Sequence, residues 1–176
     1  MKNKLVLLAL LALGQLWPSL ALASQEENKL LAVFLGRFAS YIEFPENKAG
    51  QFVITVIDEN PFGNLLDELY QGKVLGGKPV LIRYATKIED VGQSDIMFIT
   101  LVNPRTRQDA IDYGVKKSIL TISTAMGFAE RGGIIQLDFL QQHPRIKINH
   151  GAAVKSNIRI GAPLLSLATV IRGDAP

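Results

Sequence analysis

Short apolar runs rich in β-branched residues alternate with helical segments along this chain, and this alternation limits the fold more than any other feature. Asn60-Pro61 predicts a turn that leads into a helix through Leu65, Leu66 and Leu69, and Thr106–Tyr113 forms a second helix with Asn103 as its cap and Pro104 at its first position. Strands interleaved with such helices indicate an α/β domain with a largely parallel sheet. The four predicted strands are FVITVID (Phe52–Asp58), PVLIRYA (Pro79–Ala85), DIMFITL (Asp95–Leu101) and SILTIS (Ser118–Ser123).

The last third of the chain predicts a different arrangement. IIQLDFL (Ile134–Leu140) and RIKIN (Arg145–Asn149) are separated by a short polar turn and read as a β-hairpin, which makes the sheet mixed. A short helix over 151–155, the strand 158–160 and a helix around 164–170 are expected to follow. The predicted fold class is therefore α/β, a single domain with a mixed, mostly parallel sheet flanked by helices and a C-terminal β-hairpin.

Residues 1–23 have the layout of a secretory signal peptide. Two lysines precede the apolar stretch Leu5–Leu13, and Ala21-Leu22-Ala23 then supplies the small residues that a signal peptidase accepts before Ser24. The apolar stretch is short for a membrane-spanning helix, although a retained membrane anchor is the alternative. We therefore expect a cleavable signal peptide at 1–23 and a single exported domain at 24–176, which is long enough for one core.

Composition and motifs argue against several classes of function. Without the two leader lysines the net charge falls from +3 to +1 and no basic tract remains, so nucleic-acid binding has little electrostatic support. The chain has no cysteine and only two histidines, His143 and His150, which we expect on the surface rather than at a metal. It has no Gly-x-Ser-x-Gly motif, and GFAERGG (Gly127–Gly133) lacks the lysine of a phosphate-binding loop. We predict no catalytic residues, no metal and no cofactor.

The stretch FLGRFASYIEFP (Phe34–Pro45) predicts a core-facing helix that ends before Pro45. Arg37 lies at the edge of its apolar arc, where a charge is costly unless it has a partner. Two interpretations stay open: its stem covers apolar surface while its head reaches water, or it binds an anion in a cleft beside the helix. The apolar arc comprises Leu30, Leu31, Phe34, Leu35, Phe38, Tyr41 and Ile42.

The order and spacing of several motifs across Asn28 to Val170 resemble the YfiR-type family of periplasmic proteins. The most specific are the aromatic-Pro pair Phe44-Pro45 after the first helix, the Asn-Pro-Phe-Gly turn from Asn60 to Gly63, the glycines of Gly127–Gly133, and Asn149 at a strand end. The resemblance implies an α/β domain, commonly dimeric, that represses a membrane-bound diguanylate cyclase by binding its periplasmic domain and so controls cyclic-di-GMP signalling and biofilm formation. It also implies a peptidoglycan-associated outer-membrane protein that sequesters the repressor. Disulfides known in the family have no counterpart here.

The resemblance further implies a pocket for small aromatic or anionic ligands. The matching ligand-binding positions are Arg37, Lys147 and Arg159, while Gly161 stands where other members carry histidine. Three convergent cations would form an anion site, whereas the alternative is three separate surface charges. For partner binding we single out Tyr41, Ile42, Phe44 and Phe62, each of which could instead belong to the core. A small-ligand-binding module of a transport or sensor system is the alternative function.

Overall fold

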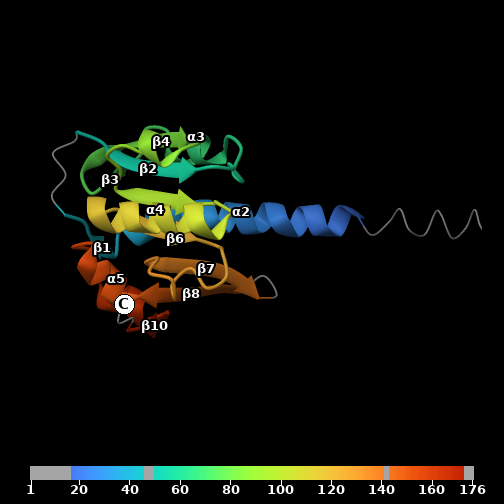
Figure 1. The fold of residues 1–176 in the computed structure, drawn as a ribbon. Helices are drawn as coiled ribbons and strands as arrows, with labels where there is room; N and C mark the ends of the chain where they lie inside the picture. The colour runs from blue at the N-terminus through green and yellow to red at the C-terminus, as the bar shows by residue number, and fades with distance from the viewer. Residues whose placement is uncertain (1–16, 46–49, 141–142, 173–176) are drawn as a thin grey trace, which may run out of the picture.

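The computed structural model describes residues 17–45, 50–140 and 143–172 of the 176-residue chain (Figure 1). Residues 1–16 of the expected signal peptide lie outside the described residues, and the side chains around its expected cleavage site are not described. The structure therefore does not test this prediction. Among the described residues, no helix combines the length and the apolar character that crossing a membrane requires. The longer elements are α2 (Trp17–Ala39), β2 (Phe52–Ile57), α3 (Leu65–Tyr70), β4 (Lys78–Ala85), β5 (Ile96–Ile99), α4 (Pro104–Lys117), β6 (Leu120–Ser123), β7 (Ile135–Leu140), β8 (His143–Asn149) and α5 (His150–Lys155).

An eight-stranded mixed sheet forms the centre of the molecule. Its strand order is β10-β8-β7-β6-β5-β2-β4-β3, with β3 (Val74–Leu75) and β10 (Thr169–Ile171) as the edges. The strands from β4 to β7 run parallel to one another, and the β7–β8 hairpin and the β3–β4 pair are antiparallel. The predicted fold class, including the C-terminal hairpin, is therefore confirmed.

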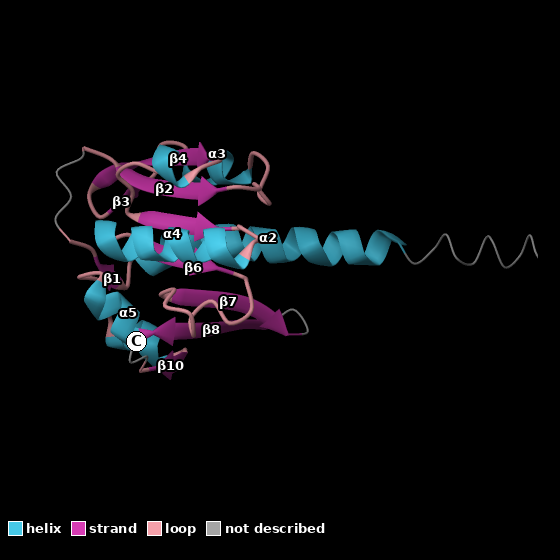
Figure 2. Cartoon of the chain, viewed as in Figure 1, coloured by secondary structure: helices cyan, strands magenta, loops and turns pink. Residues whose placement is uncertain are grey.

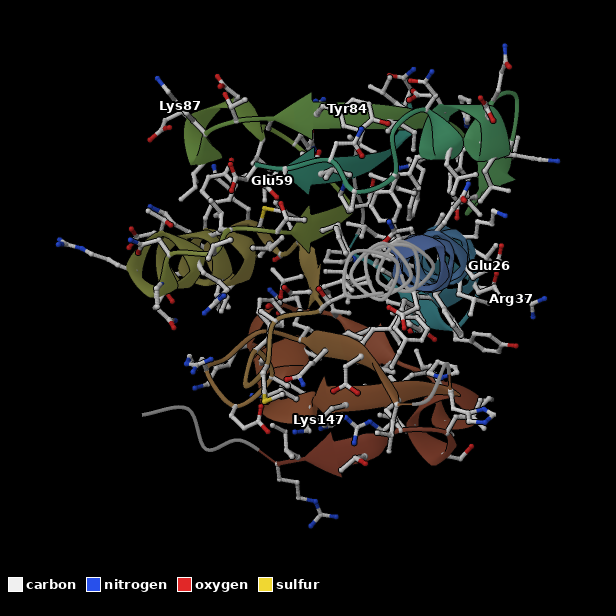
Figure 3. All side chains as sticks on the ribbon, turned by 90° about the vertical axis from the view of Figure 1, so that its right-hand side faces the viewer. Glu26, Arg37, Glu59, Tyr84, Lys87 and Lys147 are labelled. Carbon is white, nitrogen blue, oxygen red and sulfur yellow. The ribbon has the colours of Figure 1, made fainter. Side chains whose placement is uncertain are left out.

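Helices cover both faces of the sheet (Figures 1 and 2). Helix α4 packs on one face over a cluster that includes Met97, Ile99 and Phe128, and α2, α3 and α5 pack on the other over a larger cluster that includes Leu35, Phe98 and Ile148. Figure 3 shows α2 and α4 nearly end-on, on opposite sides of the strands. Because both faces are covered, β2, β5 and β6 are buried along their whole length, as the apolar sequences of β2 and β5 predict.

Several helix boundaries follow from local chemistry. Asn103 caps α4 by accepting hydrogen bonds from the N–H groups of Arg105 (2.9 Å) and Thr106 (3.4 Å), and Pro104 occupies the first turn, as predicted. Asn149 ends β8 and caps α5 by accepting from the N–H of Ala152 at 2.8 Å. The capping signals in the sequence therefore place both helices.

The prediction was wrong at two places. The first helix ends at Ala39 and does not continue to the Phe44-Pro45 pair, and Ile42–Glu43 forms a short strand, β1, that pairs with β9 (Arg159–Ile160). The final helix, α6, covers only Ala162–Ser166, and Thr169–Ile171 is the parallel edge strand β10 instead of helix. The run of β-branched residues in Thr169–Ile171 favours a strand over a helix end.

Candidate functional site

Most of the predicted site residues lie around the end of α2. There the N–H groups of Ser40 and Tyr41 donate to the carbonyls of Arg37 (3.1 Å) and Phe38 (3.0 Å), so the last turn is tight and helical hydrogen bonding stops. The chain then enters β1, in which Ile42 points into the core and its neighbours point outward. This alternation places Tyr41 on the surface.

Two grooves meet at this end of the helix. One, of about 500 Å³, runs along β1 and β9 past Tyr41, Glu43 and Arg159. The other, of about 270 Å³, lies between α2, the end of α3 and β3, and Arg37 and Lys73 line it. Ser40 lines both grooves, so they are neighbours. We call the combined region the α2-end surface and define it by Arg37, Ser40, Tyr41, Glu43, Lys73 and Arg159.

A buried tyrosine supports the helix beneath this surface. The hydroxyl of Tyr70 accepts from the N–H of Gly36 at 2.7 Å and donates to the carbonyl of Ala32 at 2.6 Å, so it is inserted between two groups that an α-helix would join directly. A Cβ at Gly36 would lie 2.5 Å from the same hydroxyl, so only glycine admits this contact. Burial raises the pKa of Tyr70, which keeps the bridging proton in place.

The α2-end surface is positively charged. Arg37, in the last turn of α2, is exposed and favourably placed at the negative end of the helix dipole. Within the part of the chain that the structure describes, neither Arg37 nor Lys73 forms an ion pair. Arg159 lies 3.7 Å from Glu43, but both side chains are largely exposed, so this pair contributes little stability.

Lys147 does not join the other predicted cations. It alternates along β8 with Ile146 and Ile148, which face α2, and therefore projects from the opposite face of the sheet. There it forms an ion pair with Glu130, whose pKa it lowers by hydrogen bonding. Figure 3 shows Arg37 and Lys147 in separate parts of the molecule. The structure thus groups Arg37 and Arg159 around Ser40 and leaves Lys147 apart.

The four predicted partner-binding residues differ in exposure. Tyr41 is 43% exposed, whereas Phe44 is half-buried and packs edge-on against Phe52 with ring centroids 5.2 Å apart. Ile42 and Phe62 are core side chains, exposed by 7% and 5%. Neither of them offers surface to a partner, so Tyr41 and the edge of Phe44 are the accessible members of the set.

Three residues of this region, Glu43, Lys73 and Gly161, were not predicted as site residues from the sequence. Lys73 and Glu43 carried no motif, and Gly161 was noted only as a departure from the family. The N–H of Gly161 donates to the carbonyl of Tyr41 at 2.8 Å, and a Cβ there would lie 2.9 Å from that oxygen. The close approach of the two backbones explains the glycine. The available sequence signal for a strand was the apolar Ile42 between two residues with polar groups, Tyr41 and Glu43.

The chemistry of the α2-end surface is that of binding. His143 and His150 are exposed, as expected. No group of three or more His, Cys, Asp or Glu side chains suited to a metal occurs among the described residues. Guanidinium and ammonium groups beside an exposed tyrosine can pair with carboxylates or other anions and can pack against an apolar or aromatic group.

Comparison with known proteins supports a regulatory class. The sequence profile of the YfiR/HmsC-like family matches residues 28–169, which is most of the chain. Among functionally curated proteins, none matches.

One solved structure has a similar fold, and a second gives a weaker match. A conserved domain protein from Vibrio cholerae O1 biovar El Tor strain N16961 is 15% identical with a TM-score of 0.56, and the match covers 81% of this chain and 59% of that one. An ABC domain from Streptococcus pneumoniae in complex with L-Trp is 13% identical with a TM-score of 0.49, covering 68% of this chain and 55% of that one. At such identities the first similarity concerns the fold alone.

Proposed function

Because the chain belongs to the YfiR/HmsC-like family, we propose that it is a periplasmic regulator that binds the periplasmic domain of an inner-membrane diguanylate cyclase and represses it. Membership over residues 28–169 is the observation that carries this proposal, and it supports a regulatory and non-catalytic role in general. Repression would lower cyclic-di-GMP and with it biofilm formation. Release through a peptidoglycan-associated outer-membrane protein and homodimerisation belong to the same proposal.

The α2-end surface is the proposed docking site for the cyclase. It contains an exposed aromatic side chain, Tyr41, and the exposed apolar side chains of Val33 (41%) and Val74 (62%) line the smaller groove beside it. Aromatic and arginine side chains are the residues that most often dominate binding energy at protein interfaces. The cations Arg37 and Lys73 beside them favour a partner surface with carboxylates and would increase the association rate at low salt.

Calorimetry tests the docking proposal. The protein is titrated with the purified periplasmic domain of a diguanylate cyclase encoded beside it, and Tyr41→Ala and Arg37→Ala are compared with wild type. Each substitution is expected to weaken binding by about tenfold or more, since anchors of this kind contribute about 2 kcal/mol when truncated. Lys147→Ala removes a cation from the opposite face and is the matched control, which should bind as wild type does. Equal affinity of all four proteins would exclude the α2-end surface.

A second candidate function is the binding of a small anion or an aromatic acid at the same surface. The observation that favours it is the pair of adjoining grooves, which place Arg37, Lys73 and Arg159 around Ser40. Benzoate is a suitable probe because it offers one carboxylate and one aromatic ring. If this function is correct, benzoate shifts the backbone NMR signals of Ser40 and Tyr41 with saturation, and no saturable shift would reject it.

A further inference from the structure

A separate cavity of about 470 Å³ opens at the opposite end of the sheet, where β5 and β6 end. From β2 the chain passes through α3 to β4 on one side, and from β5 it passes through α4 to β6 on the other side, so the strand order reverses between β2 and β5. In open α/β sheets, ligands bind outside the carboxyl ends of the strands at such a point. In Figure 1 the arrowheads of β2 and β4 point to this end, and Figure 3 views it from there. We call it the carboxyl-edge cavity.

Internal hydrogen bonds fix the edge of this cavity. The hydroxyl of Ser123 donates to the carbonyl of Ile99 at 2.6 Å, and that of Thr100 donates to the carbonyls of Ile57 at 2.7 Å and Glu59 at 2.9 Å. The three strands are thereby joined just beyond their last paired residues. The volume lies within the range of about 300–1,000 Å³ of small-molecule sites, and such sites are usually formed before the ligand arrives.

The walls combine apolar side chains with two opposite charges. Leu31, Phe98 and Phe139 supply apolar surface. Arg107 reaches the cavity from α4, with Nη1 donating to the carbonyl of Leu101 at 3.2 Å. Glu27 reaches it from α2, which lies on the other face of the sheet, and forms no ion pair among the residues that the structure describes.

The third charged group of the lining is already neutralised. Asp138 accepts from Nε of Arg145 at 2.7 Å through one carboxylate oxygen and from Nε2 of Gln136 at 3.1 Å through the other. The charge pattern offered to a ligand is therefore one guanidinium on the α4 side and one carboxylate on the α2 side.

We propose that the carboxyl-edge cavity binds a short peptide with free termini, its carboxylate at Arg107 and its ammonium at Glu27. A guanidinium pairs with a carboxylate through two parallel hydrogen bonds, and an ammonium pairs with a carboxylate. Because the two charges come from opposite sides of the sheet, the ligand must hold its own charges apart. A free amino acid carries both on one carbon, whereas an extended peptide separates its termini by about 3.5 Å per residue. Small apolar side chains of the peptide would pack on Leu31, Phe98 and Phe139.

Calorimetry with three forms of one tripeptide tests this assignment. The probe is Ala-Leu-Ala with free termini, compared with its N-acetylated form and its C-terminal amide. The protein is purified from its producing cells without any engineered truncation. Wild type is expected to bind the free tripeptide at least about tenfold more tightly than either blocked form, since each block removes one charge-assisted hydrogen bond.

Two variants assign the two ends of the peptide. Arg107→Gln is expected to abolish the preference for the free acid over the amide while keeping the preference for the free amine, and Glu27→Gln is expected to do the reverse. Arg107→Lys keeps the charge and should retain part of the affinity, which separates recognition from the bond to Leu101. Arg105→Gln, on the same helix as Arg107 but exposed and outside the lining of the cavity, is the matched control and should bind as wild type does.

Three results would overturn the proposal. They are the absence of saturable binding at millimolar tripeptide, equal affinity of the free and blocked forms, and equal weakening by Arg105→Gln and Arg107→Gln. None of them bears on cyclase binding at the α2-end surface, so the two proposals fail independently.

Discussion

Replacing Gly36 with alanine is expected to destabilise the protein, although alanine is the better helix former. The new Cβ would lie 2.5 Å from the hydroxyl of Tyr70 and 2.7 Å from its ring carbon Cε1, so the ring must move away from α2. Its bonds to Gly36 and Ala32 are then lost, at about 1 kcal/mol each, and crowding in the core adds about 1–3 kcal/mol. Helix propensity returns about 1 kcal/mol. The expected net loss in the free energy of unfolding is about 2–4 kcal/mol.

Urea denaturation followed by circular dichroism measures this loss. Gly50→Ala is the matched control, because no atom lies within 4 Å of a Cβ at that position. Combining Gly36→Ala with Tyr70→Phe should cost less than the sum of the single changes, since each single change removes the same two bonds of the Tyr70 hydroxyl and the double change removes them once. A Gly36→Ala protein as stable as wild type would refute the reasoning.

Three further outcomes are expected. Burial raises the folded-state pKa of Tyr70, so the stability that its protonated hydroxyl contributes is complete below the unfolded pKa, near 10, and is lost as the pH rises through the folded value. The fall in the urea midpoint above about pH 10 should therefore be smaller in Tyr70→Phe than in wild type. Lys147 lowers the pKa of Glu130, so this pair stabilises the fold above the unfolded pKa of a glutamate, and that stabilisation is lost as the pH falls through the folded value. Glu130→Gln should reduce the free energy of unfolding at pH 7 by no more than about 1 kcal/mol, and its free energy of unfolding should fall less than that of wild type in acid. Asn149→Ala removes the cap of α5 and a buried bond of 2.8 Å to the carbonyl of Ala129, and thermal unfolding should report a loss of about 2–3 kcal/mol.

The longer strands of the sheet could be predicted because each is marked by the residues of its own short segment. Buried parallel strands are apolar on both faces, so a continuous apolar run such as Ile96–Ile99 can be recognised in the sequence. The two strands of the hairpin can be recognised by the short polar turn between them. The short strands β1, β3 and β10 could not be predicted in this way. They have two or three residues each. Pairing with the distant strands β9 and β8 makes β1 and β10 strands, and β3 pairs with the adjacent strand β4 across a two-residue turn.

The candidate site was harder to predict, because its residues come together only through tertiary structure. Arg37 and Arg159 are far apart in sequence and meet around Ser40 because β1 pairs with β9. Lys147 was assigned to the same group, yet its position beside Ile146 and Ile148 in an alternating strand already sends it to the opposite face. Phe62 was a candidate for partner binding because it lies near an element end, with the core as the alternative; it is a core residue that packs against Phe98 with ring centroids 5.1 Å apart.

The measurement that tests the central claim most directly is the rate of cyclic-di-GMP synthesis by the full-length cyclase in proteoliposomes, with this protein added on the side of the cyclase's periplasmic domain. The account predicts that wild type lowers the rate with saturation, that Tyr41→Ala and Arg37→Ala shift the half-maximal concentration upward by about tenfold, and that Lys147→Ala acts as wild type does. A rate that stays constant at saturating concentrations of the protein would contradict it.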